Sequence, residues 1–140
     1  MRTAALTAMV VSALTLTAAA AAATPSRGVT GTIISQTTVG GKDIIVREIT
    51  LDHGASTGWH WHDGTLFAYV KQGTLTHDDS DCTTQDVYPA GSAFIEPAGN
   101  DHVHIGRNLG NTPVILEVVY VLPHGKPLSE DAPNPGCDFQ

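Results

Sequence analysis

Beyond Pro25, apolar residues occur in short runs that Gly, Pro, Asn and Asp interrupt, and this pattern constrains the fold more than any other feature. The runs are rich in Val, Ile, Thr and aromatic residues, which is typical of β-strands bounded by turns. We expect eight or nine strands, at about 29–35, 44–51, 58–62, 66–71, 74–77, 85–88, 93–96, 101–107 and 114–122. Short strands at this spacing predict an all-β domain, a jelly roll of two packed sheets.

The length of 140 residues allows one domain, and the first 23 residues do not resemble part of it. They comprise a basic start at Arg2, a mostly apolar stretch and an alanine-rich end, as in a secretory signal peptide cleaved near Ala23. The apolar stretch is too short and too broken by threonines for a stable membrane span. We therefore expect a secreted, extracellular protein with a β-barrel at 24–122 and an irregular tail at 123–140.

The two cysteines, Cys82 and Cys137, are expected to form a disulfide, because export places them in an oxidising compartment. The bond would pin the proline-rich tail to the barrel. The alternative, a thiolate in a metal site, is the weaker hypothesis.

Two His-x-His pairs stand in segments expected to be strands, His60/His62 and His102/His104. Residues two apart on a strand share a face, so neighbouring strands could direct these imidazoles at one point. Such a cluster is how proteins bind a divalent metal.

These residues resemble the motifs of a single-domain cupin. Gly54, His60, His62 and Gly73 match the first cupin motif, in which Gly, five residues and His-x-His precede a glutamate and a closing Gly. The second motif matches at Gly91, Pro97, Gly99 and Asn108. The resemblance implies a double-stranded β-helix, or jelly-roll barrel, with a metal centre for a small-molecule ligand or substrate.

The chain departs from the motifs at two places. Leu66 stands where the first motif has its glutamate, which leaves a mostly histidine site. The second motif has two extra residues before Asn108, so counting from Gly99 selects His102 as the ligand and counting back from Asn108 selects His104. We favour His104, since the turn at Asn108 fixes the strand register, with His102 as an alternate or additional ligand.

Other polar residues are weaker candidates. Tyr69 could point into the barrel and donate a hydrogen bond, and its alternative is a core aromatic. Glu96 could be a general base or a further metal ligand, and its alternatives are a salt bridge and a solvated strand end. Trp59 and Trp61 alternate with the first histidine pair and are expected to pack on the opposite face. Three more histidines are expected not to be ligands: His53, His77 and His124.

A three-histidine centre could hold Fe, Mn, Zn, Ni or Cu, and the resemblance adds manganese and iron(II) as the usual occupants. Open coordination positions would suit oxidoreductase or dioxygenase chemistry with iron, or isomerase or lyase chemistry with zinc or nickel. The alternative is a non-catalytic extracellular module that binds a metal, a small ligand or a sugar. A germin-like manganese enzyme is a narrower option that Leu66 weakens.

The charge and the last strand limit the partners. A formal net charge of −7 with scattered basic residues argues against nucleic acid. The strand expected at 114–122 is apolar at nearly every position, which is typical of a strand covered on both faces. A homodimer that packs through its sheets is one way to cover it.

Overall fold

The computed structural model describes residues 22–140 and confirms the all-β prediction, with no helix in that range. The expected signal peptide therefore lies outside the described residues, apart from its last two positions. The strands are β1 (Arg27–Val39), β2 (Lys42–Ser56), β3 (His60–Trp61), β4 (Thr65–Gln72), β5 (Thr74–Asp79), β6 (Gln85–Pro89), β7 (Ala93–Glu96), β8 (His104–Arg107), β9 (Val114–Pro123) and β10 (Glu130–Asp131). None of the segments in 22–140 forms a helix that could span a bilayer.

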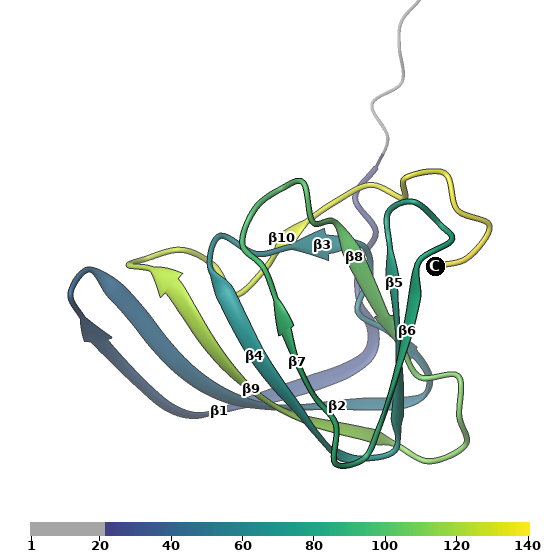
Figure 1. Cartoon of the computed structure of the whole chain (residues 1–140), viewed down its shortest axis with the longest axis horizontal. Coiled ribbons are helices and arrows are strands. Elements are labelled where there is room, and N and C mark those ends of the chain that lie inside the picture. Colours follow the sequence, from purple (N-terminus) through teal and green to yellow (C-terminus); the bar gives the residue numbers. More distant parts are fainter. Residues whose placement is uncertain (1–21) are drawn as a thin grey trace, which may run out of the picture.

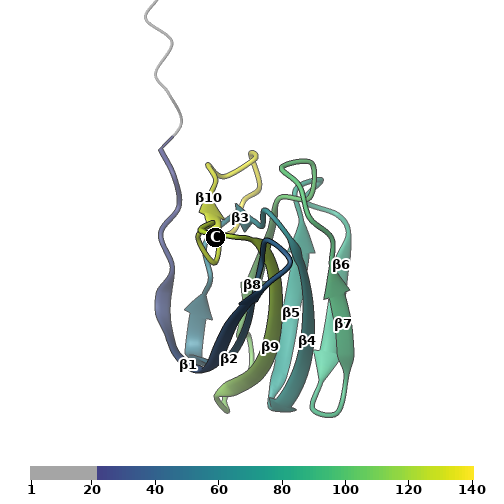
Figure 2. The ribbon, with the colours of Figure 1, turned by 90° about the vertical axis from the view of Figure 1, so that its left-hand side faces the viewer.

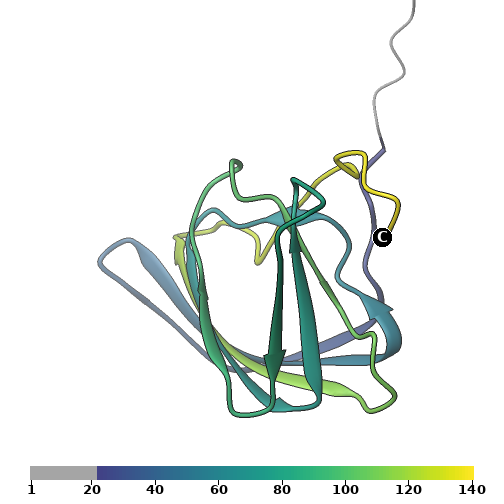
Figure 3. The same ribbon diagram turned by 45° about the vertical axis from the view of Figure 1, so that its right-hand side comes forward.

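The strands pair antiparallel into a nearly closed barrel. The main path runs β10-β3-β8-β2-β9-β4-β7, with β1 beside β2 and with β5 joining β6 to β8 (Figures 1 and 2). The β1–β2 hairpin extends beyond the barrel wall, whereas β5, β6 and β7 form the wall that comes forward in Figure 3. The long register between β2 and β9 fixes which residues of both strands face inward.

Alternating burial along β9 shows how the core is built. Its even-numbered residues, Val114 to Leu122, are buried, and its odd-numbered residues face outward and are only partly covered. The inward residues pack with Leu51, Leu66 and Val70 in the main core. The strand is therefore covered on one face within this chain, and the homodimer stays a prediction.

Strand lengths near the histidines differ from the prediction. The strand expected at 101–107 begins only at His104, because the turn after Gly99 extends through His102, whose N–H donates to the Gly99 carbonyl. Gly99 has φ = +123°, which favours glycine. The two extra residues of the second motif thus belong to this turn, and the strand register follows Asn108 as expected.

The tail after Pro123 contains a short strand, which the sequence analysis did not expect. β10 pairs with β3, with Asp131 opposite His60. The Cys82–Cys137 disulfide is present, and Phe139 packs against Trp59 and under the guanidinium of Arg107. The tail is thereby fastened along the mouth of the barrel (Figure 1).

Candidate metal centre

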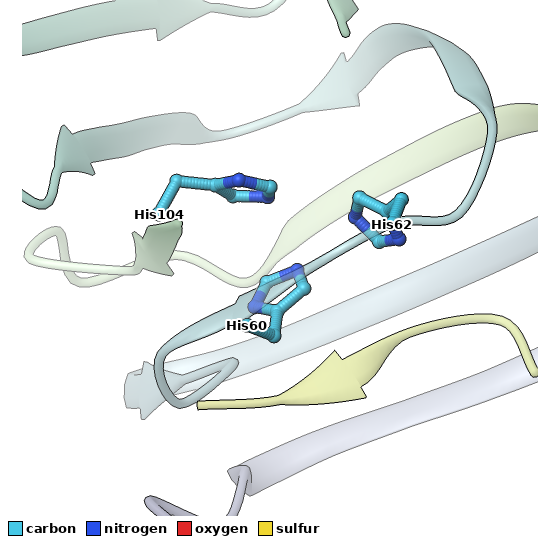
Figure 4. Close-up of side chains that lie close together, drawn as sticks. All are labelled: His60, His62 and His104. Atoms are coloured by element: carbon cyan, nitrogen blue, oxygen red, sulfur yellow. The ribbon is translucent and has the colours of Figure 1, made fainter. Parts of the chain in front are cut away.

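Three imidazoles, one from β3, one from the residue after β3 and one from β8, meet inside the barrel (Figure 4). His60 and His104 are directly opposite each other in the β3–β8 pair, and His62 follows two residues after His60. Their ring centroids are 4.4 to 5.2 Å apart, and one nitrogen from each lies within 4.8 Å of the others. All three side chains are buried.

Backbone carbonyls fix the tautomer of each ring. The Nδ1–H groups donate to Gly58 O at 2.9 Å (His60), Leu128 O at 2.7 Å (His62) and His102 O at 3.0 Å (His104). A carbonyl only accepts, so Nδ1 must carry the proton and a neutral ring presents the Nε2 lone pair to the cluster. The three rings are thus oriented as metal ligands, and the tail supplies one of the three carbonyls.

Asn108 directly follows β8, the strand that carries His104, and fixes the end of that strand. Its side chain is fully buried, and Nδ2 donates to the carbonyls of Leu51, Asp52 and Thr112. Its Oδ1 accepts the N–H of Gly110. The bonds to Leu51 and Asp52 tie the end of β8 to β2, and the bonds with Thr112 and Gly110 close the turn that follows Asn108. The position of Asn108 therefore fixes the register of β8.

Glu96 brings a carboxylate into the cluster. Its Oε2 lies 3.1 Å from His62 Nε2 and 3.5 Å from His104 Nε2, and the side chain is 12% exposed. Glu96 pairs in register with Leu66, so both point inward from neighbouring strands. The missing motif glutamate at position 66 therefore has a carboxylate substitute one strand away. Of the two alternatives for Glu96, the solvated strand end is wrong, and the ion-pair contacts are those with His62, His77 and His104.

The electrostatics of the cluster favour a neutral His60 ring near an ionised carboxylate. Burial, aided by the neighbouring rings of His104 and His62, lowers the pKa of His60 to about 3. Burial would raise the pKa of Glu96, but contacts with His104, His62 and His77 hold it well below its usual value.

His77 also reaches the cluster, which the sequence analysis missed. Its Nε2 lies 3.5 Å from Glu96 Oε1, and its ring stacks on His104 with centroids 4.8 Å apart. Burial lowers the pKa of His77, but Glu96 and the acidic groups of Asp79 and Asp86 outweigh burial and raise it. Although aspartates follow His77 in the sequence, Asp78 is buried, because Arg107 pairs with it at 2.8 Å.

His102 lies beside the cluster and is partly buried. With His77 and His104 it forms a second group of three whose ligand atoms lie within 4.8 Å of one another. Burial, together with the nearby ring of His104, lowers the pKa of His102. The structure thus places His104 in both groups and His102 only in the second.

The remaining candidates lie away from the cluster. Tyr69 points outward from β4 and is 47% exposed, so the expectation that it could face the barrel interior is wrong. Its neighbours Ala68 and Val70 take the inward positions. His53 and His124 are exposed, as expected for residues outside the site, and Trp59 is fully buried in a separate core with Ile105 and Ala132.

Two cavities adjoin the histidines. An inner one of about 50 Å³ is lined mostly by apolar core residues together with His77, Glu96 and His104. A larger one of about 220 Å³ opens at the barrel mouth, where Arg47, Ser129 and Asp131 contribute to its wall. His60 and His62 line both cavities, so a ligand in the outer cavity would lie next to the cluster.

The side chains present fit a metal ion. The buried Nε2 atoms of His62, His77 and His104 have no hydrogen-bond partner among the described residues. With Nδ1 protonated, the Nε2 lone pair of His62 faces a Glu96 oxygen at 3.1 Å, an arrangement that needs a cation or a proton between them. Two donors bound about 2.1 Å from one ion lie about 3.0 to 3.4 Å apart, close to the separations of Glu96 from His62 and His104.

Comparisons with known proteins agree with this architecture. The sequence matches the family model of the cupin domain over residues 47–121. The polyketide cyclase RemF from Streptomyces resistomycificus has a similar structure, with TM-score 0.64 and 19% identity over 80% of this chain and 79% of that chain. KdgF from Halomonas sp. has TM-score 0.54 and 19% identity over 69% of this chain and 80% of that chain.

A recombinant oxalate oxidase in complex with glycolate has TM-score 0.57 and 20% identity, over 71% of this chain and 53% of that chain. At these identities the structural likeness shows the fold alone. No curated protein sequence matches the chain.

Proposed function

This chain belongs to the cupin family, and we propose that it is a divalent-metal cupin that acts on a small organic molecule at the mouth of its barrel. The observation that supports this proposal most is the cluster of His60, His62 and His104, whose Nδ1 atoms carry protons. Glu96 adds a carboxylate to this cluster. Oxidation of the bound molecule by dioxygen is the reaction class we propose first.

The donor set supports iron, manganese, zinc or nickel. Three neutral imidazoles and one carboxylate suit these borderline and hard ions, and no thiolate is available among the described residues because both cysteines form the disulfide. When bound, such an ion supplies a Lewis acid or a redox partner for an oxygen atom of the substrate.

The protein's own residues would do three things at this centre. His60, His62 and His104 would hold the ion, and their carbonyl partners would keep the rings from rotating. Glu96 would neutralise part of the ion's charge. The apolar inner cavity would exclude water from the inner side of the centre.

We propose further that the protein works outside the cytoplasm. The disulfide supports this location, because such bonds persist in oxidising compartments. Thr24, directly after the expected cleavage near Ala23, contacts the folded domain, because its N–H and hydroxyl both bond to the Ala132 carbonyl.

Oxygen uptake by the iron-loaded protein tests the proposed reaction. We expect substrate-dependent uptake with at least one member of a panel of organic acids, phenols, thiols and diketones. His60→Ala should abolish uptake, whereas His53→Ala should not, since His53 is exposed and bonds only to the Gly110 carbonyl at 2.6 Å. Absence of uptake by the wild type across the panel would overturn the oxidase proposal and favour a binding module.

A further inference from the structure

A single arginine faces the outer cavity beside the histidines. Arg47 lies on β2 in register with Val118 of β9, and Val118 is buried, so Arg47 belongs to the inward face of the barrel. It lines the cavity of about 220 Å³ together with His60, His62 and Tyr120. A charged side chain at an inward position costs free energy unless a partner or ligand compensates its charge.

No carboxylate of the described chain neutralises this guanidinium. The lysine and arginine partners of the ion pairs within 22–140 are Lys71, Arg107 and Lys126, and Arg47 takes part in none of them. Burial raises the pKa of Tyr120, and the positive charge of the nearby Arg47 opposes that rise. Arg47 therefore retains donors for a ligand.

The backbone of β1 makes room for the guanidinium. A Cβ added at Gly31 would overlap the Nη2, Nε and Cζ atoms of Arg47, so the guanidinium lies directly over this glycine. Gly31 is in an ordinary strand conformation and is not required by a turn. The guanidinium thus lies against the backbone of β1, at the wall of the outer cavity.

We infer that Arg47 is the specificity residue of the site and that it selects a small molecule bearing a carboxylate. The inference rests on the proposed function, because it names the ligand class of the same centre. The planar guanidinium matches a carboxylate through two parallel hydrogen bonds, and the rest of the molecule would lie between Arg47 and the histidines.

The charges in the cavity favour a carboxylate over a phosphate. Among the lining residues, Arg47 is the one lysine or arginine, and Asp131 of β10 is the one carboxylate. A single guanidinium balances a monoanion, whereas a phosphate dianion would need further donors and would be repelled by Asp131.

Calorimetric titration of the metal-loaded protein tests the inference. The probes are acetate, lactate, pyruvate, succinate and benzoate, each beside its uncharged amide, together with inorganic phosphate. We expect at least one acid to bind more tightly than its amide and than phosphate. Arg47→Gln should weaken binding of that acid by about 10- to 100-fold, the range expected for a hydrogen-bonded charge pair, and Arg47→Lys should restore only part of the affinity.

Lys71→Gln is the matched control, because it removes one positive charge from the outer face of β4. Its affinity for the acid should equal that of the wild type. The inference is overturned if no acid binds, if acids bind no better than their amides or than phosphate, or if Arg47→Gln binds as the wild type does.

Metal content measured on the same samples separates the two proposals. If Arg47→Gln keeps its metal but loses the acid, both proposals stand. If the wild type and Arg47→Gln keep metal and bind the acid alike, the inference alone fails. If the wild type holds no metal, the proposed function is wrong, and the inference that rests on it is wrong as well.

Discussion

At the scale of single residues, the carboxylate of Glu96 determines the character of the candidate centre. With Leu66 at the motif position, the sequence predicts a centre without a carboxylate. Glu96 fills that role from the paired position on the next strand, 3.1 Å from His62 Nε2. The centre is therefore less positive than three neutral histidines alone would make it.

Glu96→Gln is expected to weaken metal binding by at least about 10-fold, since even groups that only orient ligands contribute about 10- to 100-fold. The amide keeps the shape of the side chain but removes its negative charge. Competition with a chelator of known affinity measures the change. Glu117→Gln is the matched control, because Glu117 is 45% exposed on the outer face, where its neighbour is Lys71. Equal affinities of Glu96→Gln and the wild type would exclude Glu96 as a ligand.

The sequence predicted some residues of the centre better than others, for a physical reason. His60, His62 and His104 could be placed because strand alternation and the Asn108 turn are local patterns. Glu96 and His77 depend on which strands pair, and a single sequence does not determine pairing across 30 or so residues. The burial of Asp78, next to His77, likewise depends on a distant residue, since its partner Arg107 lies 29 positions further along the chain.

At the scale of elements, the tail after β9 is part of the site. Leu128 orients His62, β10 pairs with β3, and Ser129 and Asp131 line the outer cavity. The sequence predicted the disulfide that fastens this tail, but not β10, because two residues are too few for a periodic pattern. The proline content predicted a tail without strands, and β10 is an exception to that prediction.

Replacing both Cys82 and Cys137 with serine is expected to lower the free energy of unfolding by about 2 to 4 kcal/mol, because the bond closes a long loop in the unfolded chain. Denaturant titration measures the loss. Reduced wild-type protein should behave like the double variant, and a loss below about 0.5 kcal/mol would contradict a stabilising role.

Mass spectrometry of protein from its natural source should show a chain that starts near Thr24 and is one pair of hydrogens lighter than its reduced form.

At the scale of the whole molecule, the barrel separates an apolar inner pocket from a polar mouth, and the histidines lie between them. The all-β jelly roll followed directly from the runs and turns of the sequence. The long β1–β2 hairpin was underestimated, since the polar residues at the end of β1 gave no periodic signal beyond Ser35. The outer face exposes Phe67, Tyr69 and Ile95, and the homodimer stays a prediction.

The most direct test of the account is an anomalous-scattering map from crystals of the metal-loaded protein. The account predicts one strong peak bonded to Nε2 of His60, His62 and His104, with a Glu96 oxygen in the same shell. His60→Ala crystals should lose the peak, and His102→Ala crystals should retain it. A peak held by His77, His102 and His104 without His60, or no peak at all, would contradict it.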